Sequence, residues 1–424
     1  MNEIISPAYL RHIGDNIRSA LKWSLFGILC GLAVGSAASI FGKLILLATS
    51  LRAAHPWILY TLPLCGLAIV GWYRLLGTRK PRGTNLVIEA LREGKRLPPA
   101  MAPLIFVSTV LTHFAGGSAG REGAALQVGG SLGSTLASLL HFKKEDSRRA
   151  IMCGMSAAFS ALFGTPLAAT VMSMEISTVG IMYYSALVPC MLSALVAHFV
   201  AEEVFGLAES SLVLGEIPAF SARQMLLIVL LAICCSVVSA LFCKIMHEVK
   251  HLETRFIVND FLRAAAAGVL VILMTLAAGS QMYNGAGSQI IEKCLTDPAF
   301  RVFPAAFLIK IIFTAVTLGG GFQGGEIVPS LFVGATFGNF FAQLAGLPSP
   351  FASAVGAAAV FCGVTNCPIT ALLISFEMFG FGASNHFLLA IAITYLLSGN
   401  FGIWSAQMIR YSKFEPGRVD RTTH

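Results

Sequence analysis

Two charged residues, Arg121 and Glu122, lie side by side in a long uncharged part of the sequence. The stretch 97–120 before the pair carries no formal charge, and neither does the stretch 123–142 after it. A charged side chain at the centre of a bilayer costs at least ~2.5 kcal/mol, so such a residue is by default a candidate functional group. Glycines surround the pair within 116–123 and let the chain leave helical geometry. Glu122 is therefore a candidate proton carrier at a break between helices.

A second glycine-rich segment, 319–329, contains Glu326. A helix that begins in such a segment presents unpaired N–H groups and the positive end of its dipole, and both favour an anion. Two breaks of this kind are expected to direct two helix N-termini toward one point, which Glu122 would occupy as a tethered anion until it is protonated. The alternative is that Glu122 only forms a buried ion pair with Arg121.

Three other charged residues lie in or next to apolar helices. Glu175 and Glu377 each follow an apolar helix, and both a functional role and a simple contact with a loop or interface remain open. We expect Lys310 to extend its ammonium group toward the membrane surface. The ten cysteines are scattered without a C-x-x-C pair, so we interpret them as small apolar packing residues.

The whole chain is strongly apolar, with 56% hydrophobic and only 12% charged residues. A soluble domain carries about 25% charged residues. The residues of the uncharged windows do not alternate as they do in the strands of a membrane barrel. Several windows reach the roughly 20 residues that a spanning helix needs, among them 23–42, 53–73, 224–243, 264–291 and 327–376. The sequence therefore predicts an all-α polytopic membrane protein.

Basic residues gather in the loop 74–96, whereas the short loop before it offers only Lys43 and Arg52. This asymmetry predicts that loop 74–96 and the N-terminus are cytoplasmic, with the protein in the cytoplasmic (inner) membrane. Residues 1–20 are too charged for a cleaved signal peptide and are interpreted as a cytoplasmic lead-in. The net charge of +8 is spread over many connectors, which argues against nucleic acid as a partner.

Two segments of the chain match each other without a gap. "GMSAAFSALFGTPLAATVMSMEI" at 154–176 aligns with "GAAAVFCGVTNCPITALLISFEM" at 356–378, and upstream Gly129 pairs with Gly334. Paired segments interrupted by Gly and Pro indicate a transporter site at the interface of two repeats. We therefore predict four parts: a lead-in (1–20), a first half (21–215), a second half (216–410) and a cytoplasmic tail without a regulatory domain (411–424).

These elements resemble the CLC family of chloride channels and anion/proton antiporters. "GREGA" at 120–124 is similar to its GREGP-type element, in which the glutamate is the external gate. "GGEIVP" at 324–329 resembles its G-x-F-x-P element, whose backbone amides line the central anion site. The resemblance implies an inverted-topology repeat with discontinuous re-entrant helices. It also implies a homodimer with one pore in each subunit.

The resemblance assigns roles to individual residues. It implies that Glu122 is the gate and the proton carrier, with Arg121 and Gly123 beside it in the same element. The amides of Ile327 and Val328 would hold the anion.

A third element of the family falls on "RGTNL" at 82–86, where chloride members have G-S-G-I-P. Thr84 would replace the serine as an anion-binding residue, between Gly83 and Asn85. An alignment shifted by one or two residues nominates Gly83 or Arg82 instead.

Several departures from the chloride pattern resemble the fluoride/proton antiporter branch of the family. Ile176 stands where chloride/proton exchangers have an internal glutamate, and Trp404 falls on the central tyrosine, although its indole N–H can still donate to an anion. That branch also carries a GGE-containing element, which makes Glu326 a second acid. Against this assignment, Val328 and Ala124 stand where the branch usually has hydroxyl residues.

We therefore predict a fluoride/proton antiporter that exports fluoride, with a halide anion and protons as its ions, membrane lipid around it, and no cofactor or metal. One alternative is a chloride channel or a chloride/proton exchanger. Another is an intramembrane metalloenzyme, because "HEVKH" at 247–251 would set His247 and His251 on one helix face with Glu248 as base. No glycine break surrounds this motif, and the enzyme is the less favoured alternative.

Overall fold

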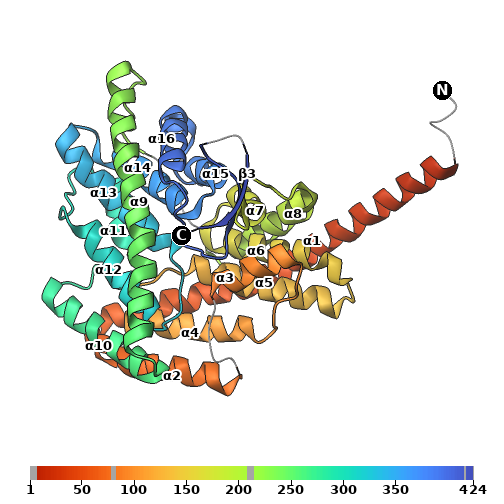
Figure 1. The fold of residues 1–424 in the computed structure, drawn as a ribbon, viewed down its shortest axis with the longest axis horizontal. Helices are drawn as coiled ribbons and strands as arrows, with labels where there is room; N and C mark the ends of the chain where they lie inside the picture. Colours follow the sequence, from red (N-terminus) through yellow and green to blue (C-terminus); the bar gives the residue numbers. More distant parts are fainter. Residues whose placement is uncertain (1–6, 78–82, 208–213, 415–416, 424) are drawn as a thin grey trace.

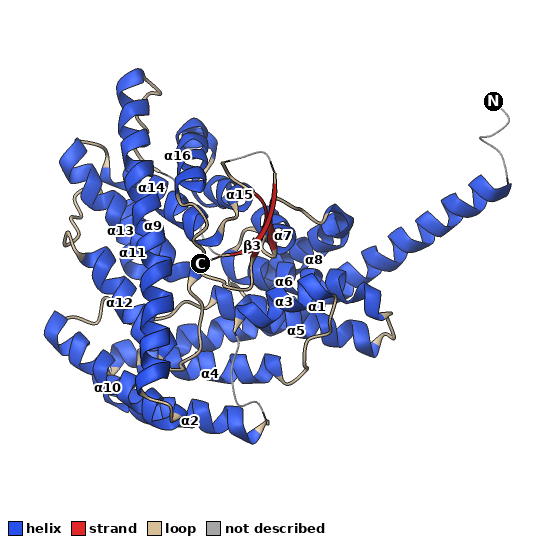
Figure 2. Ribbon diagram, in the orientation of Figure 1, coloured by secondary structure: helices blue, strands red, loops and turns tan. Residues whose placement is uncertain are grey.

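The computed structural model describes residues 7–77, 83–207, 214–414 and 417–423, and these fold into sixteen α-helices with a few short strands (Figures 1 and 2). Arg82, an alternative to Thr84 in the sequence, lies outside the described residues. The helices of the first half of the chain are α1 (Pro7–Ala54), α2 (Leu62–Leu75), α3 (Thr84–Glu93), α4 (Met101–Ala115), α5 (Glu122–Leu139), α6 (Ser147–Phe163), α7 (Pro166–Glu175) and α8 (Leu187–Phe199). Those of the second are α9 (Ala222–Phe256), α10 (Asp260–Ala278), α11 (Ser288–Thr296), α12 (Ala306–Gly319), α13 (Ile327–Ala345), α14 (Ser349–Thr365), α15 (Pro368–Phe379) and α16 (Ser384–Leu397).

The helices range in length from 9 to 48 residues, which confirms the expected mixture of spanning and discontinuous helices. α1 has 48 residues and α9 has 35, and both are long and apolar enough to cross a membrane. By contrast, α3 and α7 have 10 residues each and α15 has 12. A bilayer needs roughly 20 residues, so the short helices end within the protein and rely on their neighbours to satisfy their terminal backbone groups.

The aligned glycines of the two repeats perform the same packing task in each half. A Cβ added to Gly129 would lie 2.3 Å from the carbonyl oxygen of Gly154, and one added to Gly334 would lie 2.4 Å from that of Gly356. Only glycine allows such an approach, so α5 packs closely on α6 and α13 packs closely on α14. The two halves therefore repeat in structure as well as in sequence, while their boundary at 215–216 stays a prediction.

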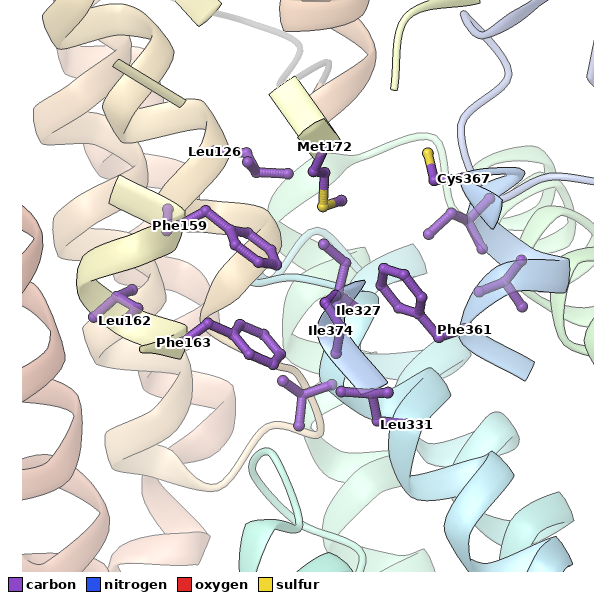
Figure 3. Close-up of a cluster of buried hydrophobic side chains, with 14 of the residues drawn as sticks. Leu126, Phe159, Leu162, Phe163, Met172, Ile327, Leu331, Phe361, Cys367 and Ile374 are labelled. Atoms are coloured by element: carbon purple, nitrogen blue, oxygen red, sulfur yellow. The ribbon is translucent and has the colours of Figure 1, made fainter. Parts of the chain in front are cut away.

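The interface between the halves is an apolar core (Figure 3). Phe159 and Phe163 of α6 stack with their ring centroids 4.7 Å apart, and they lie near Ile327 at the start of α13 and Phe361 of α14. All four side chains are buried. Burial of apolar surface from both repeats stabilises their contact, at roughly 25 cal/mol per Å² removed from water.

A pair of reciprocal caps joins the two proline-initiated helices. Both carboxylate oxygens of Glu377, in the last turn of α15, accept from the N–H groups of Leu167 and Ala168 at the start of α7, at 2.8 and 2.9 Å. In return, Glu175 at the end of α7 accepts from the N–H groups of Ile369 and Thr370 at the start of α15, at 3.2 and 2.9 Å. Each carboxylate satisfies orphan donors of the other half, so both residues have a structural contact.

The C-terminal segment folds back onto the helices as a small sheet that the sequence analysis did not predict. β2 (Met408–Tyr411) pairs in parallel with β1 (Thr178–Val179) and antiparallel with β3 (Arg418–Thr422). β1 has only two residues, and two residues separate it from the end of α7. The backbone groups that it leaves unpaired are a template for the returning chain, because an open strand edge favours further pairing.

Candidate functional site

The two glycine-rich breaks meet as predicted. Gly120 N donates to Gly325 O at 2.8 Å, and Gly325 N donates to Gly120 O at 2.7 Å, which forms an isolated antiparallel bridge. α5 begins at Glu122 and α13 begins at Ile327, so each helix starts two residues after its bridge glycine. A Cβ on Gly325 would lie 2.4 Å from Gly123 N. The absence of side chains at these glycines therefore brings two helix N-termini into direct contact.

Glu122 is buried at this junction, with 3% of its surface exposed. Its Oε2 accepts from the backbone N–H of Arg121 at 3.0 Å, and its Oε1 accepts from Nε of the same arginine, also at 3.0 Å. Arg121 Nη2 also donates to the carbonyl oxygen of Leu162 at 3.1 Å. The ion pair offered by the sequence as the alternative is therefore present, together with the expected position at a helix N-terminus.

The carboxylate of Glu122 also lies beside the first turn of the second broken helix. A Cβ added to Gly120 would lie 3.1 Å from Glu122 Oε2 and 3.1 Å from Val328 Cβ, so both atoms border the same point. Ile327 and Val328 are buried in the first turn of α13. The N–H groups of a first turn have no intrahelical acceptor, which leaves them available for an anion.

A cavity of about 760 Å³ approaches the second break. It is lined by Glu326 and by four of the predicted anion-binding residues, namely Gly83, Thr84, Asn85 and Trp404. Glu326 Oε2 is buried and has no hydrogen-bond partner within the described residues. The sequence-predicted site residues therefore fall into two groups: Glu122, Arg121, Gly123, Ile327 and Val328 at the junction, and the others along the cavity.

Gln127 connects the two groups, and sequence reasoning missed it. Its Nε2 donates to Thr84 Oγ1 at 3.2 Å and to the carbonyl oxygen of Gly123 at 3.3 Å. Its Oε1 is buried without a partner in the described part of the chain. The available signal was a single amide within "AALQVGG", an otherwise apolar helix start.

Trp404 lies in a segment that the rest of the chain holds firmly. Its side chain is 1% exposed, and its Nε1 has no hydrogen-bond partner among the residues described. Two residues later, Ala406 N donates to Asn85 Oδ1 at 2.9 Å. Thr423, after β3, donates through Oγ1 to Trp404 O at 2.6 Å. The indole N–H is thus a buried donor on a residue that lines the cavity.

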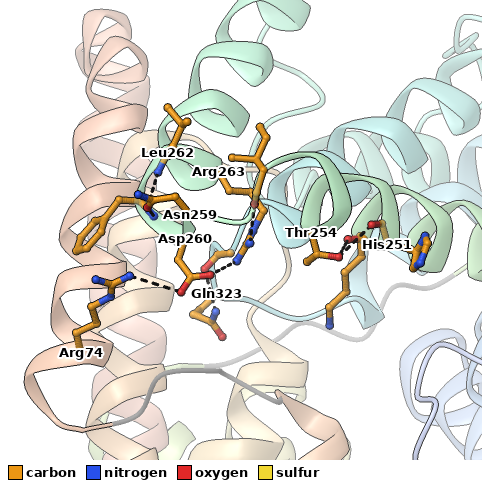
Figure 4. A network of polar contacts seen from close by, with 12 residues as sticks. Arg74, His251, Thr254, Asn259, Asp260, Leu262, Arg263 and Gln323 are labelled. Carbon is orange, nitrogen blue, oxygen red and sulfur yellow. Dashed lines mark hydrogen bonds and ion pairs between the residues drawn. The ribbon is translucent and has the colours of Figure 1, made fainter.

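The mouth of the cavity carries a network of basic and polar side chains (Figure 4). Arg263 Nη2 lies 2.7 Å from Asp260 Oδ1, and Arg74 Nη2 lies 3.8 Å from Asp260 Oδ2. Lys250 and His251 also line the cavity. Three basic residues (Arg74, Lys250 and Arg263) and two acids (Asp260 and Glu326) line the cavity, so its lining has a small excess of positive charge, which attracts anions.

The structure bears on two expectations about residues of the second half. Lys310 was predicted to reach the membrane surface, and this is wrong: its side chain is wholly buried, and Nζ donates to the carbonyl oxygens of Tyr283 and Gly285 at 2.9 and 2.7 Å. Nε2 of His247, in the HEVKH motif, lies 3.3 Å from the carbonyl oxygen of Ile403. No group of three His, Cys, Asp or Glu side chains that could hold a metal occurs in the described ranges.

The cysteines pack as small apolar residues. All ten are free thiols, and apart from Cys65 and Cys234, which are half-buried, they are buried in the helix core.

A many-helix membrane protein whose two inverted repeats meet at broken helix N-termini belongs to the class of ion-transport proteins. The chain is a member of the CLC family, because the sequence profile described as voltage gated chloride channel matches residues 65–399. This family consists of channels and antiporters, so the chain is an anion-transport protein and not an enzyme.

Individual relatives agree with this assignment. A chloride/fluoride channel protein of Pseudomonas syringae pv. tomato is 34% identical over 396 residues, which cover 92% of this chain and 87% of that protein. The voltage-gated ClC-type chloride channel ClcB of Salmonella typhimurium is 24% identical over 74% of this chain and 76% of its own. The crystal structure of a CLC-type fluoride/proton antiporter has a TM-score of 0.88 at 29% identity, covering 92% of this chain and 98% of that one. A slow cyanobacterial Cl⁻/H⁺ antiporter, at 18% identity and a TM-score of 0.73 over 89% and 94% of the two chains, shares the fold.

Proposed function

We propose that this protein exchanges fluoride for protons and exports fluoride across the cytoplasmic membrane. The observation that carries the proposal is the position of Glu122, a buried carboxylate at the bridge of Gly120 with Gly325, where two helix N-termini begin. A carboxylate there competes with a small anion for the same N–H groups. Protonation removes the negative charge of Glu122, weakens its contact with Arg121, and allows the anion to take its place.

The cavity supplies the second half of the mechanism. Glu326 borders the cavity and is the acid that exchanges protons between water and the junction. Thr84, Gln127 and Trp404 offer hydroxyl, amide and indole donors along the same wall. Asn85 binds Ala406 N and so positions the Trp404 segment, in addition to lining the cavity. The anion thus moves from donors on the cavity wall to the N–H groups of Ile327 and Val328.

We propose fluoride, and not chloride, as the transported anion for two reasons. The Pseudomonas syringae protein and the fluoride/proton antiporter structure named above are both associated with fluoride, at 34% and 29% identity. Ile176, at the position of the internal glutamate of chloride/proton exchangers, is fully buried and carries no proton. Chloride transport is the second candidate, and Val328 favours it. Fluoride is smaller and more strongly hydrated than chloride, and the apolar side chain of Val328 beside the anion position offers it no extra hydrogen-bond donor.

We further propose that the cavity and both chain termini face the cytoplasm. Arg92, in α3 within the basic segment 74–96, donates to the carbonyl oxygen of Ala406 at 2.8 Å, so this segment lies beside the Trp404 segment and the cavity. Basic residues favour the cytoplasmic side. The homodimer implied by the resemblance is kept as part of the proposal, and the mass of the detergent-solubilised protein tests it.

Flux from reconstituted vesicles tests the proposed function. Fluoride and proton electrodes read together should show fluoride efflux coupled to proton uptake. Glu122→Gln should abolish proton movement while fluoride flux persists, whereas Glu248→Gln, an exposed carboxylate on α9, should behave like wild type. Proton uptake unaffected by Glu122→Gln contradicts the gate assignment. Equal rates with fluoride and chloride gradients remove the fluoride preference.

A further inference from the structure

A buried guanidinium lies near the start of α2, whose other end lines the cavity. Arg52, in the last turn of α1, is 7% exposed, and its Nε and Nη1 have no hydrogen-bond partner among the described residues. A Cβ added to Gly116 would lie 3.1 Å from both Arg52 and Leu59, the latter just before α2. The far end of this 14-residue helix, Tyr73 and Arg74, lines the cavity. A helix of this length separates the two places by about 21 Å.

The guanidinium is pressed against two stretches of bare backbone. A Cβ on Gly116 would lie 3.1 Å from Arg52 Nη1, and one on Gly285 would lie 3.2 Å from Arg52 Nη2. The carbonyl oxygens here already accept from other groups: Gly116 O from Asn284 Nδ2 at 2.8 Å, Gly117 O from Gly285 N at 3.0 Å, and Gly285 O from Lys310 Nζ at 2.7 Å. The guanidinium of Arg52 therefore supplies hydrogen-bond donors at a place where the three neighbouring carbonyl oxygens already accept hydrogen bonds from other groups.

Positive charge at this place is not balanced by the protein. Lys310 is wholly buried and shares Gly285 with Arg52, and His113, whose Nε2 is buried without a partner in the described ranges, lies in the same helix turn as Gly116. Within the described residues, no carboxylate forms an ion pair with Arg52 or Lys310. A buried charge is costly unless it is paired, so two neighbouring cations need an anion from outside the chain.

We propose that the forked guanidinium of Arg52, supported by the ammonium group of Lys310, forms a second anion site that receives a small monovalent anion beyond the first break. Gly116 and Gly117 open the same glycine segment that ends at Glu122, so an anion displaced along this segment reaches Arg52 next. The proposal rests on the anion transport proposed above and adds a site on the face opposite the cavity. The close approach of the glycines favours a halide over a larger oxyanion.

Sided kinetics test this site. In vesicles that contain the protein in a single orientation, fluoride is varied on one face at a time while fluoride and proton fluxes are recorded. Arg52→Gln should raise KM for fluoride about tenfold on the Arg52 face, the change expected from losing one charge-assisted hydrogen bond. KM on the cavity face and the number of protons exchanged per anion should not change. Lys43→Gln, which removes an exposed charge from the same helix, is the matched control.

Arg52→Lys keeps the charge but loses the fork, so KM on the Arg52 face should rise about two- to threefold. If Arg52→Gln does not fold, this variant decides the question. An unchanged KM on the Arg52 face, or an equal rise on both faces, overturns the proposal. If wild-type protein moves no fluoride with protons, the proposed function fails instead. If wild-type transport is coupled normally but the Arg52 variants change KM equally on both faces or on neither, only the Arg52 site is overturned.

Discussion

The two glycine-rich breaks are built alike, but they present their carboxylates differently. Arg121 precedes the first residue of α5 with φ −102° and ψ −24°, and Glu326 precedes the first residue of α13 with φ −90° and ψ −13°. The first break therefore has an arginine before the helix and Glu122 as its first residue. The second has a glutamate before the helix and Ile327 as its first residue.

This shift by one residue changes the direction in which each acid points. Successive residues at a helix start are rotated by about 100°, so equivalent backbones send the two carboxylates to different places. Glu122 accepts two hydrogen bonds from Arg121, whereas Glu326 borders the cavity with Oε2 unpartnered in the described part of the chain. The two repeats therefore provide equivalent helix starts, and a one-residue shift places one carboxylate against Arg121 and the other beside the cavity.

The largest expected effect comes from removing either of the two acids. Glu326→Gln should lower proton flux by about tenfold or more, the lower range of what one general acid contributes, while fluoride flux continues. If the two carboxylates act on one proton path, Glu122→Gln with Glu326→Gln should be no worse than Glu122→Gln alone. Proton fluxes from the four proteins in parallel vesicles give the comparison. Proton flux that persists in both single variants and falls further in the double variant would show two separate paths.

A methyl group at the bridge should disturb both breaks together. Gly325→Ala places a Cβ 2.4 Å from Gly123 N, so the bridge must open and the helix starts must separate. We expect a loss of about 1–3 kcal/mol in stability, as is usual for overpacking, together with a large fall in fluoride flux. Thermal unfolding in detergent and vesicle flux provide the measurements. Gly71→Ala, with nothing within 4 Å of the added Cβ, is the control and should not lose stability.

A hydroxyl added beside the gate should sharpen the selectivity of the junction. Val328 Cβ and Glu122 Oε2 border the same point, so Val328→Thr places a donor next to the anion position with little change in volume. We expect the fluoride-to-chloride flux ratio to rise several-fold, as one neutral hydrogen bond of about 1 kcal/mol allows. Ser330→Thr, two residues later at a side chain whose Oγ donates to Ile327 O at 2.6 Å, serves as the control. An unchanged ratio places the anion elsewhere.

The smallest expected effect is a change in stability with pH that depends on Lys413, which lies between β2 and β3. Burial lowers the pKa of Lys413 to about 8, while Nζ lies 2.6 Å from Asn366 Oδ1 and 3.2 Å from Ser398 Oγ. Between this pKa and the ordinary value of 10.5, the unfolded chain binds more protons than the folded chain, so stability should rise with pH. Below pH 8 the penalty is fully present.

Lys413→Met should remove this rise, and thermal unfolding of wild type and variant from pH 7 to 10 measures it. Lys143→Met, an exposed lysine, should keep the wild-type profile. A variant that follows wild type across the whole range would contradict the assignment.

The sequence was sufficient where local signals carry the information. Glycine around an isolated charge predicted the breaks that hold Glu122 and Glu326, and long uncharged windows predicted the spanning helices. The repeat was visible because proline and glycine perform the same packing task twice, as Gly129 and Gly334 show. These features depend on residues close together in the chain.

Contacts between distant segments could not be predicted in the same way. Asn85 meets Ala406 across 321 positions, and Gln127 reaches Thr84 across 43. Lys310 was misjudged because its partners are backbone carbonyl oxygens, which every loop offers and no sequence pattern marks. Such pairings follow from how helices pack, which a single sequence does not specify.

The exchanged caps of α7 and α15 have a consequence for how the chain came to be built. Glu175 accepts from the N–H groups at the start of α15 in the second half, and Glu377 accepts from those at the start of α7 in the first half. Either half expressed by itself would therefore leave these N–H groups without their carboxylate acceptors. Two separate copies of a half-length ancestor, inserted in opposite directions, would meet the same need by trading carboxylates. Fusion of the two genes would then preserve hydrogen bonds that already existed between two separate chains.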